Sequence, residues 1–356
     1  MRVTQIVFAT ESVAPKNSGI GRVARLMTRV FQERVSDQRG GLYTVSLNDG
    51  ESGADMDASI SRCHGSRLRF VAEIQGRALL ARKVAYDSLS MARAHLMGPA
   101  CLRPSLAWMH GIEVWENARN VHLRVARRMN LLVTNSEYTK SRAERLHQVL
   151  AHARVCWLGT ETDGPVDSVF GLDHTPTVLI LARIDRESYK GHEELIRSWP
   201  DVLRQVPKAR LLIAGDGPGF EDLHRRIAHS PSAQNIELAG FIPEEKIPAL
   251  WNETDVFAMP SRGEGFGLVY IEAMRHGKPV IASRQDAGQE INIHGETGFN
   301  VDLDRPTDLV QALVRLLTDP TLARSMGQAG QERWNRNFSW SAFRARFTNL
   351  IEQEGF

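Results

Sequence analysis

From residue 177 onward, short apolar runs alternate with longer segments in which apolar and polar residues are mixed. The apolar runs are typical of buried strands, and the mixed segments are typical of helices. Regular alternation of this kind predicts a parallel sheet covered by helices on both faces. The expected strands are residues 177–181, 210–214, 236–238, 255–259 and 280–282, and the expected helices are 193–204, 220–229, 245–251, 267–275, 307–317 and 322–335.

The first half of the chain shows the same rhythm less regularly. Its expected strands are residues 3–9, 43–47, 106–109, 131–134 and 155–158, its expected helices are 20–34, 73–96, 121–129 and 137–150, and residues 49–66 are expected to be a loop. A chain of 356 residues is long enough for two domains. The sequence predicts an α/β protein of two Rossmann-like, doubly wound domains, with ligands in a cleft at the carboxyl ends of the strands. The expected parts are residues 1–165 and 166–337, joined by a linker at 164–175, and a C-terminal helix in 338–356.

Composition excludes several other classes of protein. Apolar residues make up 42% of the chain and charged residues 24%, as in soluble globular proteins. Three widely spaced cysteines (Cys63, Cys101 and Cys156) predict neither a disulfide framework nor a metal cluster. No signal peptide is recognisable, and no apolar run reaches the roughly 20 residues that span a bilayer. These features favour a reducing cytoplasm.

The net charge of +2 hides a strong local imbalance. Residues 60–155 contain 16 Lys and Arg against 6 Asp and Glu, a local balance of +10. A basic segment in an otherwise acidic chain indicates that the first domain faces something anionic. No nucleic-acid-binding motif is present, so an anionic membrane surface or a phosphate-bearing acceptor is the better hypothesis. The alternative is a solvated basic surface on a soluble enzyme. The expected contacts are Arg77, Arg82, Lys83, Arg93, Arg124, Arg127 and Arg128.

Residues 261–272 (SRGEGFGLVYIE) combine two carboxylates with a glycine-rich turn. An expected strand precedes the turn and an expected helix follows it, which leaves unpaired backbone N–H groups at the positive end of the helix dipole. Such a helix end favours a phosphate. The alternative is an ordinary strand-to-helix junction in which Glu264 and Glu272 are simply solvated.

The whole string resembles the Glu-x7-Glu signature of retaining, nucleotide-sugar-dependent glycosyltransferases of the GT-B fold, family 4. The similarity extends over residues 179–334. The resemblance implies that Glu264 bonds the hydroxyls of the donor sugar and that Glu272 binds the ribose. It also implies a C-terminal helix that crosses back onto the first domain. The other donor-binding residues expected in this string are Phe266, Gly267, Leu268 and Val269, through whose N–H groups the diphosphate is held.

Two cations follow the first strand of the second domain. In such enzymes a nucleoside diphosphate leaves, so negative charge grows on its oxygens, and Arg183 and Lys190 are expected to stabilise that charge without a metal. The alternative is that both are solvated loop residues. Ala182 replaces the glycine that usually precedes this arginine, and the loop is slightly long, so Arg186 is a substitute for Lys190.

Several other positions match the resemblance. Gly215, in the turn after the second strand, is expected to let the backbone approach the nucleotide, and Ile242 to bond the base through its main chain. Gly19 and Gly21 are expected to begin a helix that faces the diphosphate. With Ala24 they also fit a dinucleotide fingerprint, but residues 10–18 separate them from the strand that should end at the first glycine, which disfavours that hypothesis.

His110 follows a strand of the first domain and is itself followed by glycine. A single histidine is more often structural, but this position resembles the family histidine that bonds a hydroxyl of the reacting sugar. His110, Glu264, Arg183 and Lys190 are therefore the expected catalytic residues, with Glu113 as a residue that orients His110 or meets the acceptor.

The predicted activity is the transfer of a hexosyl unit from a nucleoside diphosphate sugar to an acceptor hydroxyl, with retention of the anomeric configuration. UDP-sugars are favoured, GDP-mannose is the second choice, and neither a cofactor nor a metal is expected. The expected acceptor is a glycan or a lipid-linked molecule in polysaccharide biosynthesis. The alternatives are a nucleotide-sugar epimerase or hydrolase of the same fold and a non-catalytic nucleotide-binding protein. A glucan phosphorylase is disfavoured because it needs a much longer chain.

Overall fold

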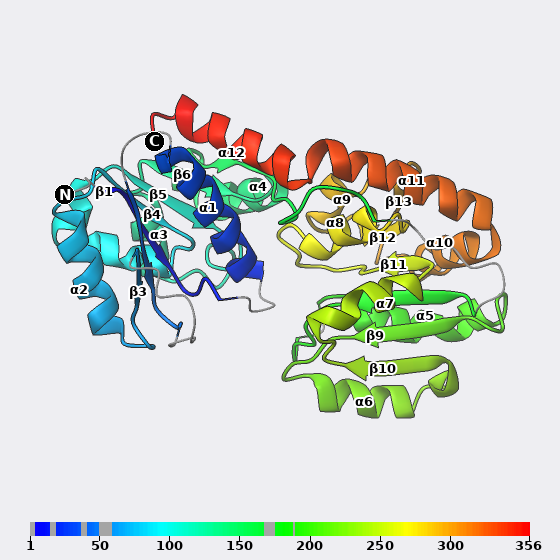
Figure 1. Cartoon of the computed structure of the whole chain (residues 1–356). Helices are drawn as coiled ribbons and strands as arrows, with labels where there is room; N and C mark the ends of the chain where they lie inside the picture. The colour runs from blue at the N-terminus through cyan, green and yellow to red at the C-terminus, as the bar shows by residue number, and fades with distance from the viewer. Residues whose placement is uncertain (1–3, 15–18, 37–40, 50–58, 167–174, 188) are drawn as a thin grey trace. The chain divides into compact units, whose positions relative to one another are not determined.

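The computed structural model describes residues 4–14, 19–36, 41–49, 59–166, 175–187 and 189–356. The chain forms two compact units: unit 1 is Met1–Glu161 with Trp340–Phe356, and unit 2 is Thr162–Ser339 (Figure 1). Most of the predicted linker at residues 164–175 lies outside the described residues.

Unit 1 is built on a parallel sheet with the strand order β3-β2-β1-β4-β5-β6-β7. The chain winds outward from β1 to β3, returns to the other side of β1 with β4, and continues to β7. The strand order therefore reverses between β1 and β4, the place where open α/β sheets bind ligands. The strands are β1 (Thr4–Thr10), β2 (Gly41–Ser46), β3 (Ile60–Arg62), β4 (Lys83–Tyr86), β5 (Ser105–Met109), β6 (Leu131–Thr134) and β7 (Arg154–Val155).

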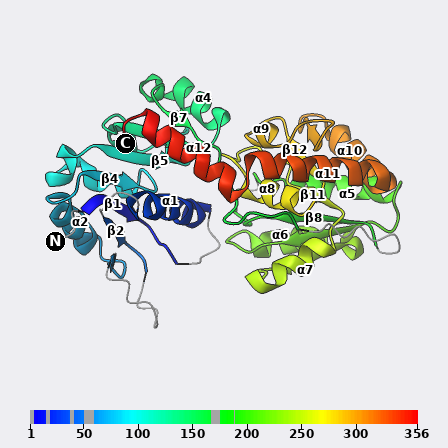
Figure 2. The same cartoon turned by 45° about the horizontal axis from the view of Figure 1, so that its top comes forward.

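Helix α12 (Trp340–Gln353) lies beside α1 (Gly19–Ser36) and closes the core of unit 1 (Figures 1 and 2). The ring of Phe347 lies 5.5 Å from that of Trp108 on β5 and 5.8 Å from that of Phe31 on α1. Burying each such ring contributes about 2–3 kcal/mol. The remaining helical segments of unit 1 are α2 (Arg67–Ala78), α3 (Asn120–Ala126), α4 (Glu137–Leu146), η1 (Met91–Leu96), η2 (Pro99–Leu102) and η3 (Gln148–Leu150).

The predicted long helix at residues 73–96 is wrong. Helix α2 ends at Ala78, and the segment continues as β4 and then η1. Strand β4 is central, pairing with β1 on one side and β5 on the other, and Val84, Ala85 and Tyr86 are fully buried. The local sequence does not mark the end of α2, because residues 73–86 contain no proline and their one glycine, Gly76, lies inside the helix. Pairing of β4 with two neighbouring strands overrides the local helical pattern. The expected loop at 49–66 is also partly wrong, since it includes β3, while residues 50–58 lie outside the described part of the chain.

Unit 2 contains a second parallel sheet with the order β10-β9-β8-β11-β12-β13. Its strand order reverses between β8 and β11. The strands are β8 (Thr177–Leu181), β9 (Arg210–Ala214), β10 (Ile236–Gly240), β11 (Val256–Ala258), β12 (Val280–Ser283) and β13 (Gly298–Val301). Strand β13 was not among the expected strands, because its glycine start and its asparagine weaken the apolar pattern.

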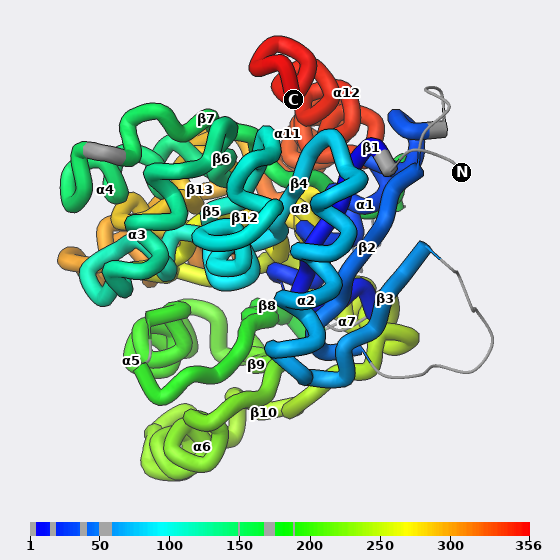
Figure 3. The backbone as a smooth tube through the Cα atoms, turned by 90° about the vertical axis from the view of Figure 1, so that its left-hand side faces the viewer, coloured from blue at the N-terminus to red at the C-terminus, as the bar shows by residue number. Residues whose placement is uncertain are grey.

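The helices of unit 2 agree closely with the expected ones: α5 (His192–Leu203), α6 (Phe220–Ala228), α7 (Ile247–Asn252), α8 (Leu268–Arg275), α10 (Pro306–Thr318) and α11 (Pro320–Asn337), with the short α9 (Gly288–Ile291) and the 3-10 turns η4 (Ala233–Asn235) and η5 (Glu244–Lys246) in addition. Helices α5 and α6 are neighbours (Figure 3). Helix α11 packs on α8, where a Cβ at Gly330 would lie 3.4 Å from the Met274 side chain.

The α/β class and the two doubly wound, Rossmann-like domains are confirmed. None of the helices in the described part of the chain is long and apolar enough to cross a membrane.

Candidate functional site

The reversal of strand order in unit 2 brings together two of the predicted catalytic residues. Lys190 follows β8 and Glu264 follows β11, and these strands are neighbours in a parallel sheet. Both residues therefore lie at the carboxyl edge of the sheet. The Lys190 ammonium forms an ion pair with Glu264 Oε2, and each side chain is only 16% exposed.

Lys190 stays charged in this setting. Burial opposes its charged form, but the Glu264 carboxylate, with Tyr189 and Asp286, outweighs burial and raises the pKa of Lys190. The loop that carries Lys190 is connected to the loop after β11, because the Tyr189 carbonyl accepts a 2.8 Å hydrogen bond from the Arg262 N–H. Gly191 has a φ of +94°, and a Cβ there would lie 2.5 Å from the Pro260 carbonyl oxygen. The β8 and β11 loops are thus fitted tightly to each other.

The peptide of Glu264 is fixed by a residue that the sequence did not single out. Asp286, in the loop after β12, accepts a 3.0 Å hydrogen bond from the Glu264 N–H. The next residue, Ala287, donates its N–H to the Glu264 carbonyl at 3.2 Å. Asp286 is fully buried, and burial raises its pKa to about 7, with a further contribution from the Glu264 charge. Its position four residues beyond an expected strand was the only signal in the sequence.

The predicted anion site at the start of α8 has suitable backbone geometry. Gly267 is the N-cap in a left-handed conformation (φ +83°), and a Cβ there would lie 2.3 Å from the Tyr270 ring. Leu268 and Val269 form the first turn, where N–H groups have no partner within the helix. Glu272 is half-buried one turn further along. Phe266 is only 2% exposed, and its ring packs 6.1 Å from that of Phe338.

The glycine-rich turn at Gly215 packs closely against the loop that follows β8. A Cβ at Gly215 would lie 1.9 Å from the Ala182 carbonyl oxygen, so only glycine permits this approach. The Ala182 N–H donates to the Ala214 carbonyl at 3.0 Å, and the Ile184 N–H donates to the Asp216 carbonyl at 3.0 Å. The turn at Gly215 therefore supports the loop that carries Arg183.

Arg183 is not brought to Lys190 and Glu264. Its Nε lies 2.8 Å from Asp185 Oδ1, and its side chain is 69% exposed. Ile242 follows β10 and is half-buried beside the exposed Phe241. Both residues belong to loops at the carboxyl edge of the same sheet, as does the Lys190–Glu264 pair.

His110, in unit 1, lies at the carboxyl end of β5. Its Nε2 lies 2.7 Å from the main-chain oxygen of Asp87, which follows β4. Because a carbonyl can only accept, Nε2 carries the proton and Nδ1 is left as an acceptor. Burial lowers the pKa of His110, which keeps the ring neutral. Glu113 accepts from the N–H groups of His110 and Ser90 at 3.3 and 3.1 Å, and burial raises its pKa.

Two buried carboxylates hold the loop between β1 and α1. Asp87 accepts from the Thr10 hydroxyl at 2.6 Å and from the Glu11 N–H at 2.9 Å, and burial raises its pKa to about 6. Asp49 accepts from the hydroxyls of Ser12 and Ser46. This loop leads toward α1, whose first residue is Gly19 and which also contains the buried Gly21. The oxygens of Asp49 are occupied inside the protein, which argues against its binding the ribose of a dinucleotide.

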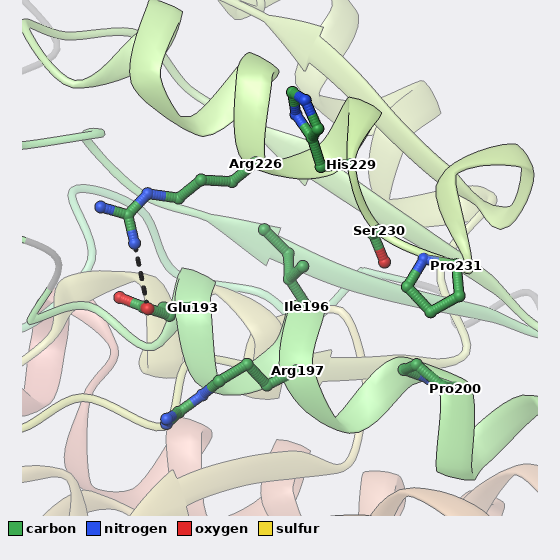
Figure 4. A pocket seen from close by; sticks show the side chains of 8 residues that line it. All are labelled: Glu193, Ile196, Arg197, Pro200, Arg226, His229, Ser230 and Pro231. Carbon is green, nitrogen blue, oxygen red and sulfur yellow. Dashed lines mark hydrogen bonds and ion pairs between the residues drawn. The ribbon is translucent and has the colours of Figure 1, made fainter.

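A separate pocket of about 350 Å³ lies between α5 and α6 (Figure 4). Arg226 extends across it to Glu193 at 3.0 Å. None of the predicted site residues lines it; the lining residues are Glu193, Ile196, Arg197, Pro200, Arg226, His229, Ser230 and Pro231. In the described part of the chain, no three His, Cys, Asp or Glu side chains gather as metal ligands would.

Comparison with known proteins identifies the family. Residues 167–333 match the family model of glycosyl transferases group 1. The chain is 32% identical to a GDP-mannose-dependent α-(1-6)-phosphatidylinositol monomannoside mannosyltransferase of Mycolicibacterium smegmatis, over 72% of this chain and 73% of that protein. It is 30% identical to the enzyme of the same name from Mycobacterium tuberculosis, over 98% of both chains.

Solved structures share the fold at lower identity. Anabaena HepE in complex with UDP and glucose superposes with a TM-score of 0.77, with 19% identity over 98% of this chain and all of that one. Sucrose-phosphate synthase from Thermosynechococcus elongatus gives a TM-score of 0.73, with 20% identity over 98% of each chain. The resemblance predicted from residues 261–272 is confirmed. The chain therefore belongs to the family of glycosyl transferases group 1, and it is a glycosyltransferase that uses a nucleotide sugar.

Proposed function

We propose that this glycosyltransferase moves a mannosyl unit from GDP-mannose to a hydroxyl group of a lipid-linked acceptor, with retention of the anomeric configuration. Two relatives support this donor and acceptor, since both are named as GDP-mannose-dependent enzymes acting on phosphatidylinositol monomannoside. GDP-mannose thus takes precedence over the UDP-sugars that the sequence alone favoured.

The observation that carries the proposal is the Lys190–Glu264 pair next to the first turn of α8. In the proposed complex the diphosphate lies on the N–H groups of Gly267, Leu268 and Val269, and the Lys190 ammonium neutralises charge on the departing GDP. Glu264 bonds hydroxyls of the sugar. Arg183 supplies a second cation when its guanidinium leaves Asp185 and binds the diphosphate. The departing phosphate oxygen takes the proton of the acceptor hydroxyl, so no enzyme nucleophile is required.

We also propose a catalytic role for His110 of unit 1. A neutral ring whose Nδ1 accepts can receive a hydrogen bond from a sugar hydroxyl, and the Asp87 carbonyl fixes the ring.

In the proposed complex Glu272 binds the ribose hydroxyls, so we expect Glu272→Ala to weaken the binding of GDP and of GDP-mannose alike.

The proposal is tested by product analysis with labelled donors. Purified enzyme is incubated with GDP-mannose or UDP-glucose, with and without phosphatidylinositol monomannoside, and the product linkage is determined by NMR. We expect an α-linked mannosyl product from GDP-mannose only, at a rate that excess EDTA leaves within twofold. Free mannose or an epimerised nucleotide sugar as the main product would support the hydrolase or epimerase instead. Loss of activity to EDTA that Mg²⁺ restores would contradict the role given to Lys190 and Arg183.

A lipid-linked acceptor requires contact with a membrane, and we propose that unit 1 rests on an anionic leaflet. Arg103 joins two exposed apolar segments by donating to the carbonyls of Ala78 and Leu79, each at 2.8 Å. In and near these segments lie four exposed apolar side chains, together called the apolar patch, which are 60–81% exposed: Leu79, Leu80, Met97 and Leu102.

Two exposed arginines lie near this patch, one by its place in the sequence and one by a hydrogen bond. Arg82 lies two residues after Leu80, and Arg128 donates to the Leu96 carbonyl at 3.4 Å, next to Met97. Of the cations expected to touch the membrane, Lys83 is a poor candidate. It lies in β4 and donates to the Gly355 carbonyl at 3.1 Å, and burial lowers its pKa. Each exposed cation near an anionic leaflet contributes about 1 kcal/mol at low salt, and apolar side chains add to this.

We expect the protein to sediment with vesicles that contain phosphatidylglycerol, and binding to fall steeply from low to physiological salt. Arg82→Glu with Arg128→Glu should abolish binding, and Leu80→Asp with Leu102→Asp should weaken it even at low salt. The control is Arg204→Glu with Arg225→Glu, which alters the net charge by the same amount but on exposed side chains of unit 2. If wild-type protein ignores anionic vesicles at low salt, the membrane proposal is wrong.

A further inference from the structure

Asp286 is a fully buried carboxylate with two main-chain donors. Its Oδ2 accepts from the Glu264 N–H at 3.0 Å, and its Oδ1 accepts from the Gly288 N–H at 2.8 Å. One side chain thereby joins the loop after β12 to the loop after β11. The Ala287 N–H completes the connection by donating to the Glu264 carbonyl.

These bonds control the direction of the Glu264 side chain. The peptide N–H and the carbonyl of Glu264 are both held, so its Cα–Cβ bond can point in only one direction. That direction leads to Lys190, with which its carboxylate pairs. A carboxylate that keeps another carboxylate in place is unusual, because two like charges so close together repel each other.

We propose that Asp286 is the positioning residue for Glu264, and that its ionised form holds the glutamate in the geometry that serves glycosyl transfer. An ionised carboxylate offers an acceptor to both N–H groups, whereas a protonated one turns one oxygen into a donor. Protonation therefore deprives one of the two N–H groups of its acceptor, and where that N–H belongs to Glu264 the side-chain link between the two loops is lost.

The groups that act on Asp286 come from several elements. The Glu264 carboxylate lies on the β11–α8 loop with the Ser261 hydroxyl, Lys190 lies on the β8–α5 loop, and Tyr270 lies on α8. Burial and the Glu264 charge raise the pKa of Asp286 to about 7, although the two hydrogen bonds from the main-chain N–H groups act to lower it. With this pKa, Asp286 becomes protonated, and its link to Glu264 is weakened, as the pH falls through about 7.

The test compares Asp286→Asn with Asp255→Asn. Asn offers one acceptor and one N–H₂ group, so one of the two N–H donors loses its partner. Asp255 also holds a main-chain N–H, that of Thr177 at 2.8 Å, but it lies at the opposite edge of the sheet, before β11. Asp255→Asn is therefore the control for a general loss of stability.

We expect Asp286→Asn to lower kcat about 10- to 100-fold while the dissociation constant of GDP changes less than twofold. The acidic limb of the wild-type pH–rate profile should disappear in Asp286→Asn and persist in Asp255→Asn. If Asp286→Asn keeps the kcat and pH profile of the wild type, the inference is wrong. If GDP affinity falls as much as kcat, the whole loop has collapsed and the positioning role is also wrong.

The inference rests on the proposed function for its kinetic readout, and hydrogen exchange provides a second readout that needs no substrate. Exchange in residues 261–267 should be at least 10-fold faster in Asp286→Asn and unchanged in Asp255→Asn. Unchanged exchange in Asp286→Asn would overturn the inference even if the enzyme were active. Inactivity of the wild type with every donor would instead overturn the proposed function alone.

Discussion

Replacing Lys190 by methionine is expected to reduce turnover by about 10²–10³-fold and to destabilise unit 2 by about 2–4 kcal/mol. The loss of turnover follows because the ammonium stabilises the departing diphosphate in a partly buried place, where one such charge is worth about 3–4 kcal/mol in the transition state. The loss of stability follows because Glu264 is left without its cation beside Asp286. Steady-state kinetics and chemical denaturation measure the two effects separately.

The double variant Lys190→Met with Glu264→Gln separates the two effects. Removing both charges should restore most of the stability and none of the turnover. In the single variant, removal of the Lys190 cation raises the pKa of the buried Asp286 further, so the folded state binds more protons than the unfolded state. Its free energy of unfolding should then decrease as the pH rises from about 4 through 7, more steeply than that of the wild type. A fully active Lys190→Met variant would remove the main support for the proposed reaction.

The sequence was most informative where the fold repeats a regular pattern. In unit 2 each expected strand from residues 177–282 is present, because every one is a short apolar run bounded by polar turns. Lys190 and Glu264 were both expected at the site because each follows such a strand and matches the motifs of the family. Their pairing could be expected only from the strand order, which places β8 beside β11 although 74 residues separate the lysine from the glutamate.

Long-range packing explains most of what the sequence did not reveal. Strand β4 was mistaken for part of a helix, and as a result Asp87, the residue that fixes His110, was not recognised as the end of a strand. Asp286 was missed because its role depends on a hydrogen bond to Glu264, 22 residues away. Arg183 was expected beside Lys190, but a nearer carboxylate, Asp185, binds it in the described structure.

Gly215 is expected to tolerate no side chain at all. Gly215→Ala should destabilise unit 2 by about 3–4 kcal/mol, because two costs combine. The backbone φ of +140° is unfavourable for alanine by about 1–3 kcal/mol. In addition the new Cβ would lie 1.9 Å from the Ala182 carbonyl oxygen, and this is backbone that cannot rotate away. The loop that carries Arg183 must therefore move, which breaks main-chain bonds such as the one from the Ile184 N–H to the Asp216 carbonyl.

The matched control for this prediction is Gly330→Ala, also in unit 2. Gly330 lies inside α11, and its new Cβ would be in ordinary contact with the Met274 side chain at 3.4 Å. We expect a change within about 1 kcal/mol, because alanine favours the helix and offsets the tighter packing. Thermal and chemical unfolding of the two variants measure the difference. If the two variants had equal free energies of unfolding, residues 182–186 would move at little cost. The loop that carries Arg183 would then not be held rigidly in the donor site.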